Sequence, residues 1–278
     1  MISLIKDFFS KENVEFYSVL SYSHCRVIRG DIIDREGFAP KSVIVFLVPY
    51  YTGETVNISK YAASLDYHII VKELTGKLIG ELKKYYPNNF FVGYGDHSPI
   101  DERHAALIGG LGILGDNGLL INKKYGSYVF IAEVISDIGE SEIQSADPEK
   151  IMRCEGCGMC KASCPTGRLS HGGKCLSEIT QQKGELSDSE VDLMKEVDTV
   201  WGCDACQSVC PHNESPILTP IDFFYKDKIV KLTSQILDEM TEDEFSQRAF
   251  SWRKLSLTPP PTSDQNRTPV RPIIVPGI

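Results

Sequence analysis

The sequence contains, at residues 154–165, the run Cys154-Glu-Gly-Cys157-Gly-Met-Cys160-Lys-Ala-Ser-Cys164-Pro165. Its spacing, C-x₂-C-x₂-C-x₃-C-P, is that of bacterial ferredoxins, in which three thiolates bind one [4Fe–4S] cluster and the fourth reaches a second cluster. A later run, Cys203-Asp-Ala-Cys206-Gln-Ser-Val-Cys210-Pro211, lacks only the first cysteine of the pattern, because Val200 occupies that position. The two runs therefore predict a pair of iron–sulfur clusters.

Two such clusters require eight thiolates. The runs supply seven, and Cys175 is the candidate for the eighth. Structural zinc and disulfides are the alternatives, but zinc sites more often use paired C-x₂-C knuckles than a triple run followed by Cys-Pro. We predict that the first cluster binds Cys154, Cys157, Cys160 and Cys210, and that the second binds Cys164, Cys175, Cys203 and Cys206.

The composition limits the class of protein. A chain of 278 residues with 42% hydrophobic residues can bury one or two cores. Its net charge of −9 argues against broad electrostatic binding of nucleic acid. Residues 1–13 are charged and amphipathic, unlike a signal peptide, and no run approaches a membrane span. We therefore expect a cytoplasmic protein without a membrane segment, where reduced thiols favour cluster assembly.

The hydrophobic pattern predicts an α+β fold, with an N-terminal α/β domain followed by a ferredoxin-like double [4Fe–4S] domain. The apolar run at residues 43–48 is typical of a strand buried on both faces. The predicted domains are 1–140, 141–220, C-terminal helices at 221–256 and a proline-rich tail at 257–278, disordered or foreign to the protein. Further expected elements are helices at 3–10, 59–86, 101–108 and 232–250, and strands at 15–20, 90–94, 118–122 and 127–135.

Two features of the N-terminal half could serve chemistry. Gly110-Leu-Gly112-Ile-Leu-Gly115 follows a helical stretch and precedes a strand, so it lacks the strand–turn–helix setting of a dinucleotide site. Its glycines either let the backbone approach a large flat ligand or simply form a turn. Asp96, at the end of a predicted strand, could transfer protons or could be a turn residue. Glu102 and Arg103 are expected to form a surface pair.

Taken together, these segments resemble the epoxyqueuosine reductase family. In the first half they are residues 96–103 (DHSPIDER), 110–115 (GLGILG), Asn117, 119–122 (LLIN) and 126–128 (GSY). In the cluster half they are residues 164–167 (CPTG), 174–176 (KCL) and 202–213 (GCDACQSVCPHN). The resemblance covers roughly residues 40–250, and this combination of motifs is specific even though the cysteine pattern alone is common.

The resemblance implies a cobalamin-dependent oxidoreductase with two [4Fe–4S] clusters that reduces epoxyqueuosine to queuosine in tRNA. It also implies a fold related to corrinoid reductive dehalogenases. An external donor of flavodoxin or ferredoxin type would supply electrons, Asp96 would donate a proton, and we expect a monomer. The positions that it places near cobalamin are Tyr61, His68, Gly110, Gly112, Gly115, Asn117 and Leu120.

The chain departs from the family pattern at two positions, with Ile113 and Asp116 where an aromatic residue and a lysine are usual. Typical members also continue into C-terminal helical repeats that help hold tRNA, whereas this chain enters its proline-rich segment soon after Trp252. Two alternatives therefore stay open. One is a corrinoid reductase of a small epoxide or halide, and the other is a non-catalytic two-cluster electron carrier.

Overall fold

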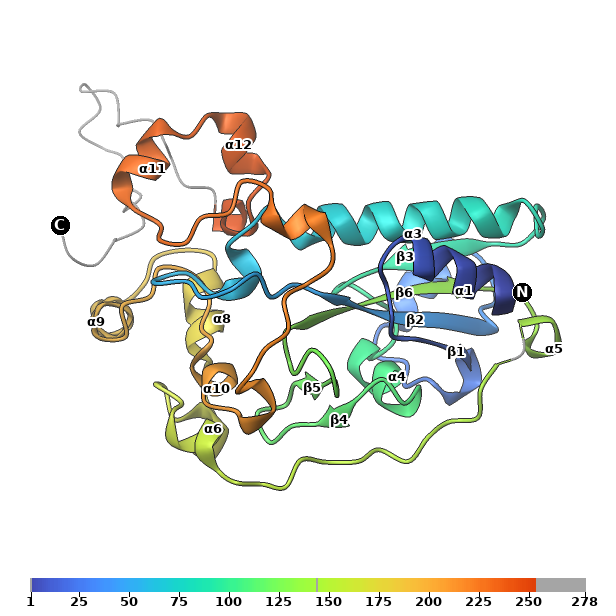
Figure 1. The fold of residues 1–278 in the computed structure, drawn as a ribbon, viewed down its shortest axis with the longest axis horizontal. Coiled ribbons are helices and arrows are strands. Elements are labelled where there is room, and N and C mark those ends of the chain that lie inside the picture. Colours follow the sequence, from blue (N-terminus) through green and yellow to red (C-terminus); the bar gives the residue numbers. More distant parts are fainter. Residues whose placement is uncertain (1, 144, 254–278) are drawn as a thin grey trace. The chain divides into compact units, whose positions relative to one another are not determined.

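The computed structural model describes residues 2–143 and 145–253, so the predicted tail at 257–278 lies outside the described residues. The chain forms two compact units, each assembled from separated segments (Figure 1). The first contains residues up to 51, 68–158 and 211–222, and the second contains 52–67, 159–210 and the chain from 223. The contiguous boundaries predicted at 140, 220 and 256 stay a prediction. Within the described residues, no helix has the length and apolar character needed to cross a membrane.

The first unit is built on a four-stranded sheet in the order β1-β2-β6-β3. Its strands are β1 (Tyr17–Ser21), β2 (Ser42–Pro49), β3 (Phe91–Tyr94) and β6 (Val129–Ser136), and each neighbouring pair is antiparallel. Every residue of β2 is buried, which confirms the prediction from its apolar run. The register pairs Val45 and Tyr94 with Glu133, so these three side chains lie on one face of the sheet.

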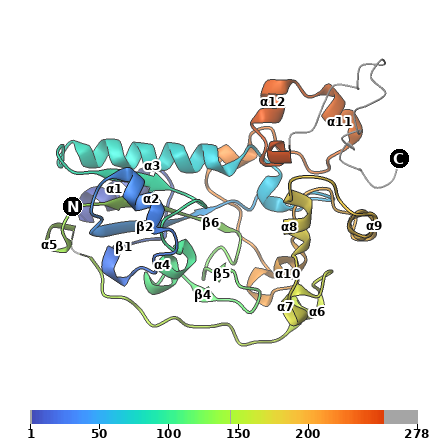
Figure 2. The same cartoon turned by 180° about the vertical axis from the view of Figure 1, so that it is seen from behind.

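Helices cover both faces of this sheet (Figures 1 and 2). α1 (Ile2–Lys11) and α3 (Tyr67–Lys83) lie on one face, where the rings of Phe9 and Phe46 are 4.9 Å apart. α4 (Glu102–Ile108) lies on the other. The remaining helices of the unit are α2 (Gly30–Glu36) and α5 (Glu140–Ile143).

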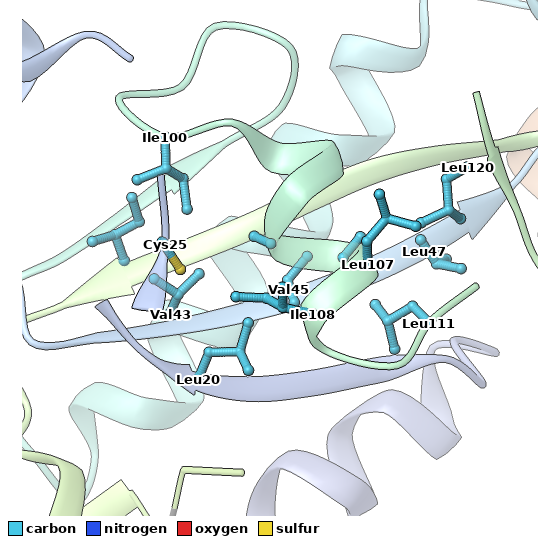
Figure 3. Close-up of a cluster of buried hydrophobic side chains, with 13 residues drawn as sticks. Leu20, Cys25, Val43, Val45, Leu47, Ile100, Leu107, Ile108, Leu111 and Leu120 are labelled. Carbon is cyan, nitrogen blue, oxygen red and sulfur yellow. The ribbon is translucent and has the colours of Figure 1, made fainter. Parts of the chain in front are cut away.

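The main core of the unit lies between α4 and the sheet (Figure 3). Val43, Val45 and Leu47 alternate along β2 and meet the buried helix residues Leu107 and Ile108. Cys25 also lies in this cluster, where burial, followed by the nearby charge of Glu133, raises the pKa of its thiol to about 12. It is therefore an inert packing residue, as expected for the one cysteine outside the ligand sets.

A two-stranded ribbon of β4 (Ile113–Leu114) and β5 (Leu120–Ile121) completes the first unit. Residues 118–122 and 127–135, both expected to be strands, do not pair with each other as a hairpin. Asn122 and Gly126 do close a tight turn through reciprocal backbone hydrogen bonds. β5 nevertheless pairs with β4, whereas β6 enters the large sheet.

The predicted helix at 59–86 is shorter in the structure, since α3 begins only at Tyr67. The preceding segment belongs to the second unit, where its backbone has other partners. The Ser59 N–H donates to Trp201 O, and the Asp66 N–H donates to Gln247 O, each at 2.8 Å. These tertiary hydrogen bonds replace the helical ones that the apolar spacing suggested.

The second unit consists of short helices. Two apolar clusters stabilise them, one of which joins Ile58, Trp201, Leu232 and Phe250 from distant parts of the chain. The unit therefore has an apolar core of its own. Its helices are α6 (Met159–Ala162), α7 (Arg168–His171), α8 (Leu176–Gln181), α9 (Asp188–Glu196), α10 (Ala205–Ser208), α11 (Ser234–Glu239) and α12 (Glu242–Ser246).

Candidate active site and cluster ligands

The second predicted ligand set lies entirely within the second unit. Burial is the main cause that raises the pKa of the Cys203 thiol, and negative charge on Cys175, Asp204 and Cys164 raises it further. Three of the four predicted ligands are thus close enough to interact electrostatically. Cysteine thiols are the donors that an iron–sulfur cluster requires, so the chemistry of this set fits such a cluster.

Cys164 has a polar environment that favours a thiolate. Its partial burial acts to raise the pKa, but the backbone N–H groups of Leu169, Thr166 and Arg168, together with the Thr166 hydroxyl, outweigh burial and lower the pKa. A lowered thiol pKa increases the fraction of the form that binds metal.

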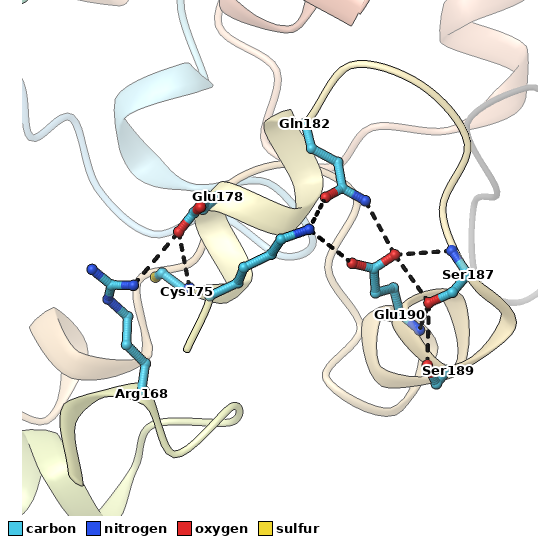
Figure 4. A network of polar contacts seen from close by, with 8 residues as sticks. Arg168, Cys175, Glu178, Gln182, Ser187, Ser189 and Glu190 are labelled. Atoms are coloured by element: carbon cyan, nitrogen blue, oxygen red, sulfur yellow. Dashed lines mark hydrogen bonds and ion pairs between the residues drawn. The ribbon is translucent and has the colours of Figure 1, made fainter. Parts of the chain in front are cut away.

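The backbone at Cys175 is held by a polar network (Figure 4). Glu178 Oε2 accepts a hydrogen bond from the Cys175 N–H at 3.4 Å and pairs with Arg168 Nη1 at 3.6 Å. On the other side of Cys175, Lys174 Nζ donates to Gln182 Oε1 at 2.6 Å and lies 3.6 Å from Glu190 Oε1. The candidate eighth ligand is therefore positioned by its neighbours in the chain.

The loop that holds Cys203 and Cys206 packs against the segment around Lys60. Asp204 Oδ2 accepts the Lys60 N–H at 2.7 Å and lies 3.7 Å from Lys60 Nζ, which is itself buried. Gly202 has φ +74°, and a Cβ there would come within 3.0 Å of the Tyr61 ring. Tyr61 is thus placed beside the cysteine loop of the second unit, and its predicted contact with cobalamin stays a prediction.

The first predicted ligand set is divided between the units, with Cys154 and Cys157 in the first and Cys160 and Cys210 in the second. Within the first unit, Cys154 is attached to the glycine-rich segment. Its N–H donates to Leu114 O at 3.0 Å, and its Sγ accepts the Asp116 N–H at 3.3 Å. Hydrogen bonds to cluster sulfurs help set reduction potentials, so Asp116 is positioned to influence this cluster.

The glycines of that segment are explained by the chain's own packing. A Cβ at Gly112 would lie 2.5 Å from Ile121 O, and one at Gly115 would lie 2.4 Å from Asn117 Oδ1. Gly110 adopts φ +72° and faces the carboxylate of Glu149. Close approach of β5 and a left-handed turn therefore account for all three glycines. Their contact with a cofactor stays a prediction.

Two other predicted cofactor residues have different environments. The side-chain nitrogen Nδ2 of Asn117 is buried and has no hydrogen-bond partner in the described part of the chain. A buried donor without a partner fits a polar group of a bound ligand. Leu120 is only 4% exposed and packs in the core cluster beneath α4.

Asp96 lies in a tight turn just after β3. Its φ of +70° is unusual for a residue other than glycine, and such backbone conformations concentrate at functional sites. Its carboxylate is 67% exposed, with Oδ2 3.9 Å from His68 Nε2. The structure thus brings together Asp96 and His68, the predicted proton donor and one of the predicted cofactor residues.

The sequence reasoning missed the role of Glu102. Glu102 Oε2 accepts the Asp96 N–H at 2.9 Å, while Arg103 donates to the carbonyl of Gly118. Glu102 and Arg103, expected to form a surface pair, therefore bond to different partners. Burial is the main cause that raises the pKa of Glu102 to about 7. Its position six residues after Asp96, at the first turn of a helix, was a usable signal.

Glu133 was also missed. It is fully buried in β6, where Ser98 Oγ donates to its Oε1 and its Oε2 has no partner among the described residues. Burial raises the pKa of Glu133 to about 8. The hydrogen bond from Ser98 acts to lower this pKa, and the negative charge of Glu102 raises it further. A glutamate inside the apolar stretch 127–135 was the signal in the sequence.

These contacts form a continuous path through the first unit. Asp96 is bonded to Glu102, α4 reaches Gly118 through Arg103, and Asp116 in the same glycine-rich segment is bonded to Cys154. A candidate proton donor and a candidate cluster ligand are therefore connected through one helix and one ribbon. The candidate proton donor and this candidate ligand thus belong to the same compact unit.

The chain is similar to known proteins in sequence and in fold. Residues 153–213 match the family described as a 4Fe-4S double cluster binding domain. The epoxyqueuosine reductase of Leadbetterella byssophila is 34% identical over 215 residues, covering 74% of this chain and 69% of that protein. That of Cellulophaga algicola is 33% identical over 227 residues, covering 74% and 70%.

The fold is also shared with solved structures. The epoxyqueuosine reductase from Streptococcus thermophilus superposes with a TM-score of 0.71 at 22% identity, over 91% of this chain and 76% of that one. A crystal structure of an epoxyqueuosine reductase with an epoxyqueuosine-modified tRNA-Tyr stem loop gives 0.69 at 23% identity, over the same shares. Given the identity and coverage of its relatives, the chain belongs to the epoxyqueuosine reductase family of oxidoreductases.

Proposed function

We propose that this protein reduces epoxyqueuosine to queuosine in tRNA, with electrons that pass through two [4Fe–4S] clusters to cobalamin. The overall change converts an epoxide to an alkene. Both carbon–oxygen bonds break, two electrons and two protons are consumed, and the oxygen leaves as water. The two clusters can deliver one electron each, and Asp96 donates one of the two protons.

The observation that best supports this function is the path from Asp96 to Cys154. The catalytic aspartate and a ligand of the first cluster are joined through α4 and the glycine-rich segment of the same unit. A simple electron carrier has no need of an acidic side chain in a strained, exposed turn at such a place. The path therefore favours a reductase over the carrier.

Cobalamin would supply the low-valent metal chemistry that reduces the carbon–oxygen bond. The residues proposed to hold it are those of the first unit around the Asp96 turn. Among them, Asn117 presents its buried donor and His68 lies beside Asp96. The chain's own contribution is to orient this cofactor and to hold a proton at the Asp96 carboxyl.

An external electron donor of flavodoxin or ferredoxin type would reduce the clusters. We place the enzyme in the cytoplasm as a monomer, in keeping with reduced cysteines that assemble clusters. The exposed Cys157 lies in the first ligand set, so the first cluster is the candidate entry point for electrons.

Transfer RNA is the proposed substrate because the relatives are named for epoxyqueuosine and one structure of this fold contains a modified stem loop. Two observations favour a second candidate, a small epoxide. Asp116 places an acidic residue beside the Cys154 loop, and the net charge of the chain is −9. Both features weaken the binding of a polyanion such as tRNA.

The test is turnover by the reconstituted protein with reductant and two substrates, an epoxyqueuosine-containing tRNA stem loop and the free epoxyqueuosine nucleoside. We expect reduction of the stem loop with the higher kcat/KM. Equal or better turnover of the nucleoside would favour the small-substrate enzyme. Asp96→Asn should keep both clusters and cobalamin but lose turnover, and full activity in that variant would remove Asp96 from the mechanism.

A further inference from the structure

The turn that presents Asp96 is attached to the protein at several points, but Asp96 itself has few partners. Gly95 is packed so closely on α3 that a Cβ would lie 2.6 Å from Val71 Cγ1. Ser98 is buried against Glu133, and Arg29 Nη1 is 2.8 Å from His97 Nδ1. At Asp96 the backbone N–H bonds to Glu102, and the exposed carboxylate lies 3.9 Å from His68.

We propose that Glu102 is a positioning residue for Asp96, because its carboxylate holds the Asp96 N–H and so stabilises the left-handed turn that aims the proton donor. This inference rests on the function proposed above. A left-handed conformation is costly for a residue other than glycine. A hydrogen bond to a charged acceptor is among the stronger ones in proteins and can offset that cost.

The position of Glu102 is itself well determined. It is the first residue of α4, whose N-cap Asp101 accepts the His104 N–H at 2.9 Å. The following turns of α4 are buried in the core against β2 and β6. A carboxylate at the first turn also interacts favourably with the helix dipole. Glu102 therefore extends from a rigid element to the backbone of Asp96 itself.

The charged groups around Glu102 make this contact depend on pH. The Asp96 carboxylate faces it from the turn, Glu133 from β6, His68 from α3 and Arg103 from α4 itself. Burial, more than any of these charges, raises the pKa of Glu102 to about 7. As pH rises through this value, the carboxylate forms and becomes the better acceptor, so the turn is held more firmly on the alkaline side.

Amide hydrogen exchange on the intact chain measures the contact without any cofactor. We expect the protection factor of the Asp96 amide, after correction for intrinsic exchange, to rise between pH 6 and pH 8 in the wild type. In Glu102→Gln it should be flat, because the neutral amide still accepts a hydrogen bond but does not titrate. In Glu102→Ala protection should fall about 10-fold or more. Glu81→Gln on α3, an exposed glutamate paired with Lys84, is the matched control.

Turnover by the loaded enzyme then separates this inference from the proposed function. Glu102→Ala should lower kcat about 10-fold or more with little change in KM, and Glu102→Gln should restore part of it and flatten the kcat–pH profile near pH 7. Unchanged Asp96 protection in Glu102→Ala would overturn the positioning role, even if Asp96→Asn abolishes turnover. Full turnover in Asp96→Asn would instead overturn the proposed function on which the role depends.

Discussion

At the scale of single residues, the first unit contains three carboxyl groups that differ in how deeply they are buried. Asp96 is exposed, Glu102 is half-buried and Glu133 is fully buried, and the pKa rises to about 7 for Glu102 and about 8 for Glu133 because burial disfavours the charged form. Ser98 donates to one Glu133 oxygen, and a proton on the other would leave the group neutral at pH 7. The sequence did not reveal this series, since burial of a glutamate depends on tertiary packing.

The buried Glu133 should make the folded protein less stable as the pH rises. Its folded-state pKa of about 8 exceeds the ordinary value of 4.5, so the folded chain retains a proton that the unfolded chain has released. This contribution to stability is complete below about pH 4.5 and is lost as pH rises to about 8. Between pH 5.5 and pH 8.5 the thermal midpoint should therefore fall further in the wild type than in Glu133→Gln. The difference between the two falls should be on the order of 5–10 °C. Parallel melting curves at the two pH values would contradict this.

Asp116 should lower the reduction potential of the first cluster. Its carboxylate adds negative charge near the cysteine run, whereas the backbone N–H that it donates to Cys154 Sγ is unchanged by a new side chain. Asp116→Lys should raise the potential of one cluster, because positive charge stabilises the reduced form, and leave the other nearly unchanged. A redox titration followed by electron paramagnetic resonance measures both. Asp192→Lys, on the exposed side of α9, is the control, and equal shifts in both variants would refute a local effect.

At the scale of elements, local patterns predicted the long strands and helices but not their partners. The apolar run of β2 and the periodicity of α3 were both recognisable. α3 begins at Tyr67 and not at residue 59, because the backbone N–H groups of Ser59 and Asp66 donate to carbonyl groups within the second unit. The glycine-rich segment was recognised, but its pairing as β4 with β5 was not. Partner choice depends on long-range contacts that a short window of sequence does not contain.

Two glycine substitutions test the packing of these elements. Gly112→Ala should destabilise the protein by about 1–3 kcal/mol, because the new Cβ would lie 2.5 Å from Ile121 O and would separate β4 from β5. Gly80→Ala, within α3 with open space around its Cβ position, should stabilise it by about 0.5–1 kcal/mol. Thermal midpoints of the two variants should move in opposite directions. A neutral Gly112→Ala would mean that the ribbon can separate without cost.

At the scale of the whole molecule, the cysteines are the part of the site that the sequence predicts best. Their assignment to two clusters is a prediction from spacing along the chain, and Cys164 and Cys175 are near enough to Cys203 to raise the pKa of its thiol. The compact units could not be predicted in the same way, because the chain passes between them more than once. Residues 52–67 belong to the second unit although the chain on either side belongs to the first, and residues 211–222 belong to the first unit although the chain on either side belongs to the second. Cobalamin contacts were inferred only by resemblance, and they stay a prediction.

Loss of the isolated ligand Cys175 tests the wiring. Cys175→Ser should remove or weaken the second cluster, so that iron content falls from about eight to about four per chain, while Cys25→Ser should leave it unchanged. Iron and sulfide analysis with electron paramagnetic resonance distinguishes the two variants. Full iron content in Cys175→Ser would assign the eighth ligand elsewhere.

The central claim is that the clusters deliver electrons to a corrinoid held by this chain. Its most direct test is the visible absorbance spectrum of the full chain, reconstituted anaerobically with iron and sulfide, incubated with cobalamin and freed of unbound cofactor. We predict a stoichiometric corrinoid band together with iron–sulfur absorbance from about eight irons per chain. A protein that holds those irons and retains no corrinoid would contradict the claim and identify an electron carrier.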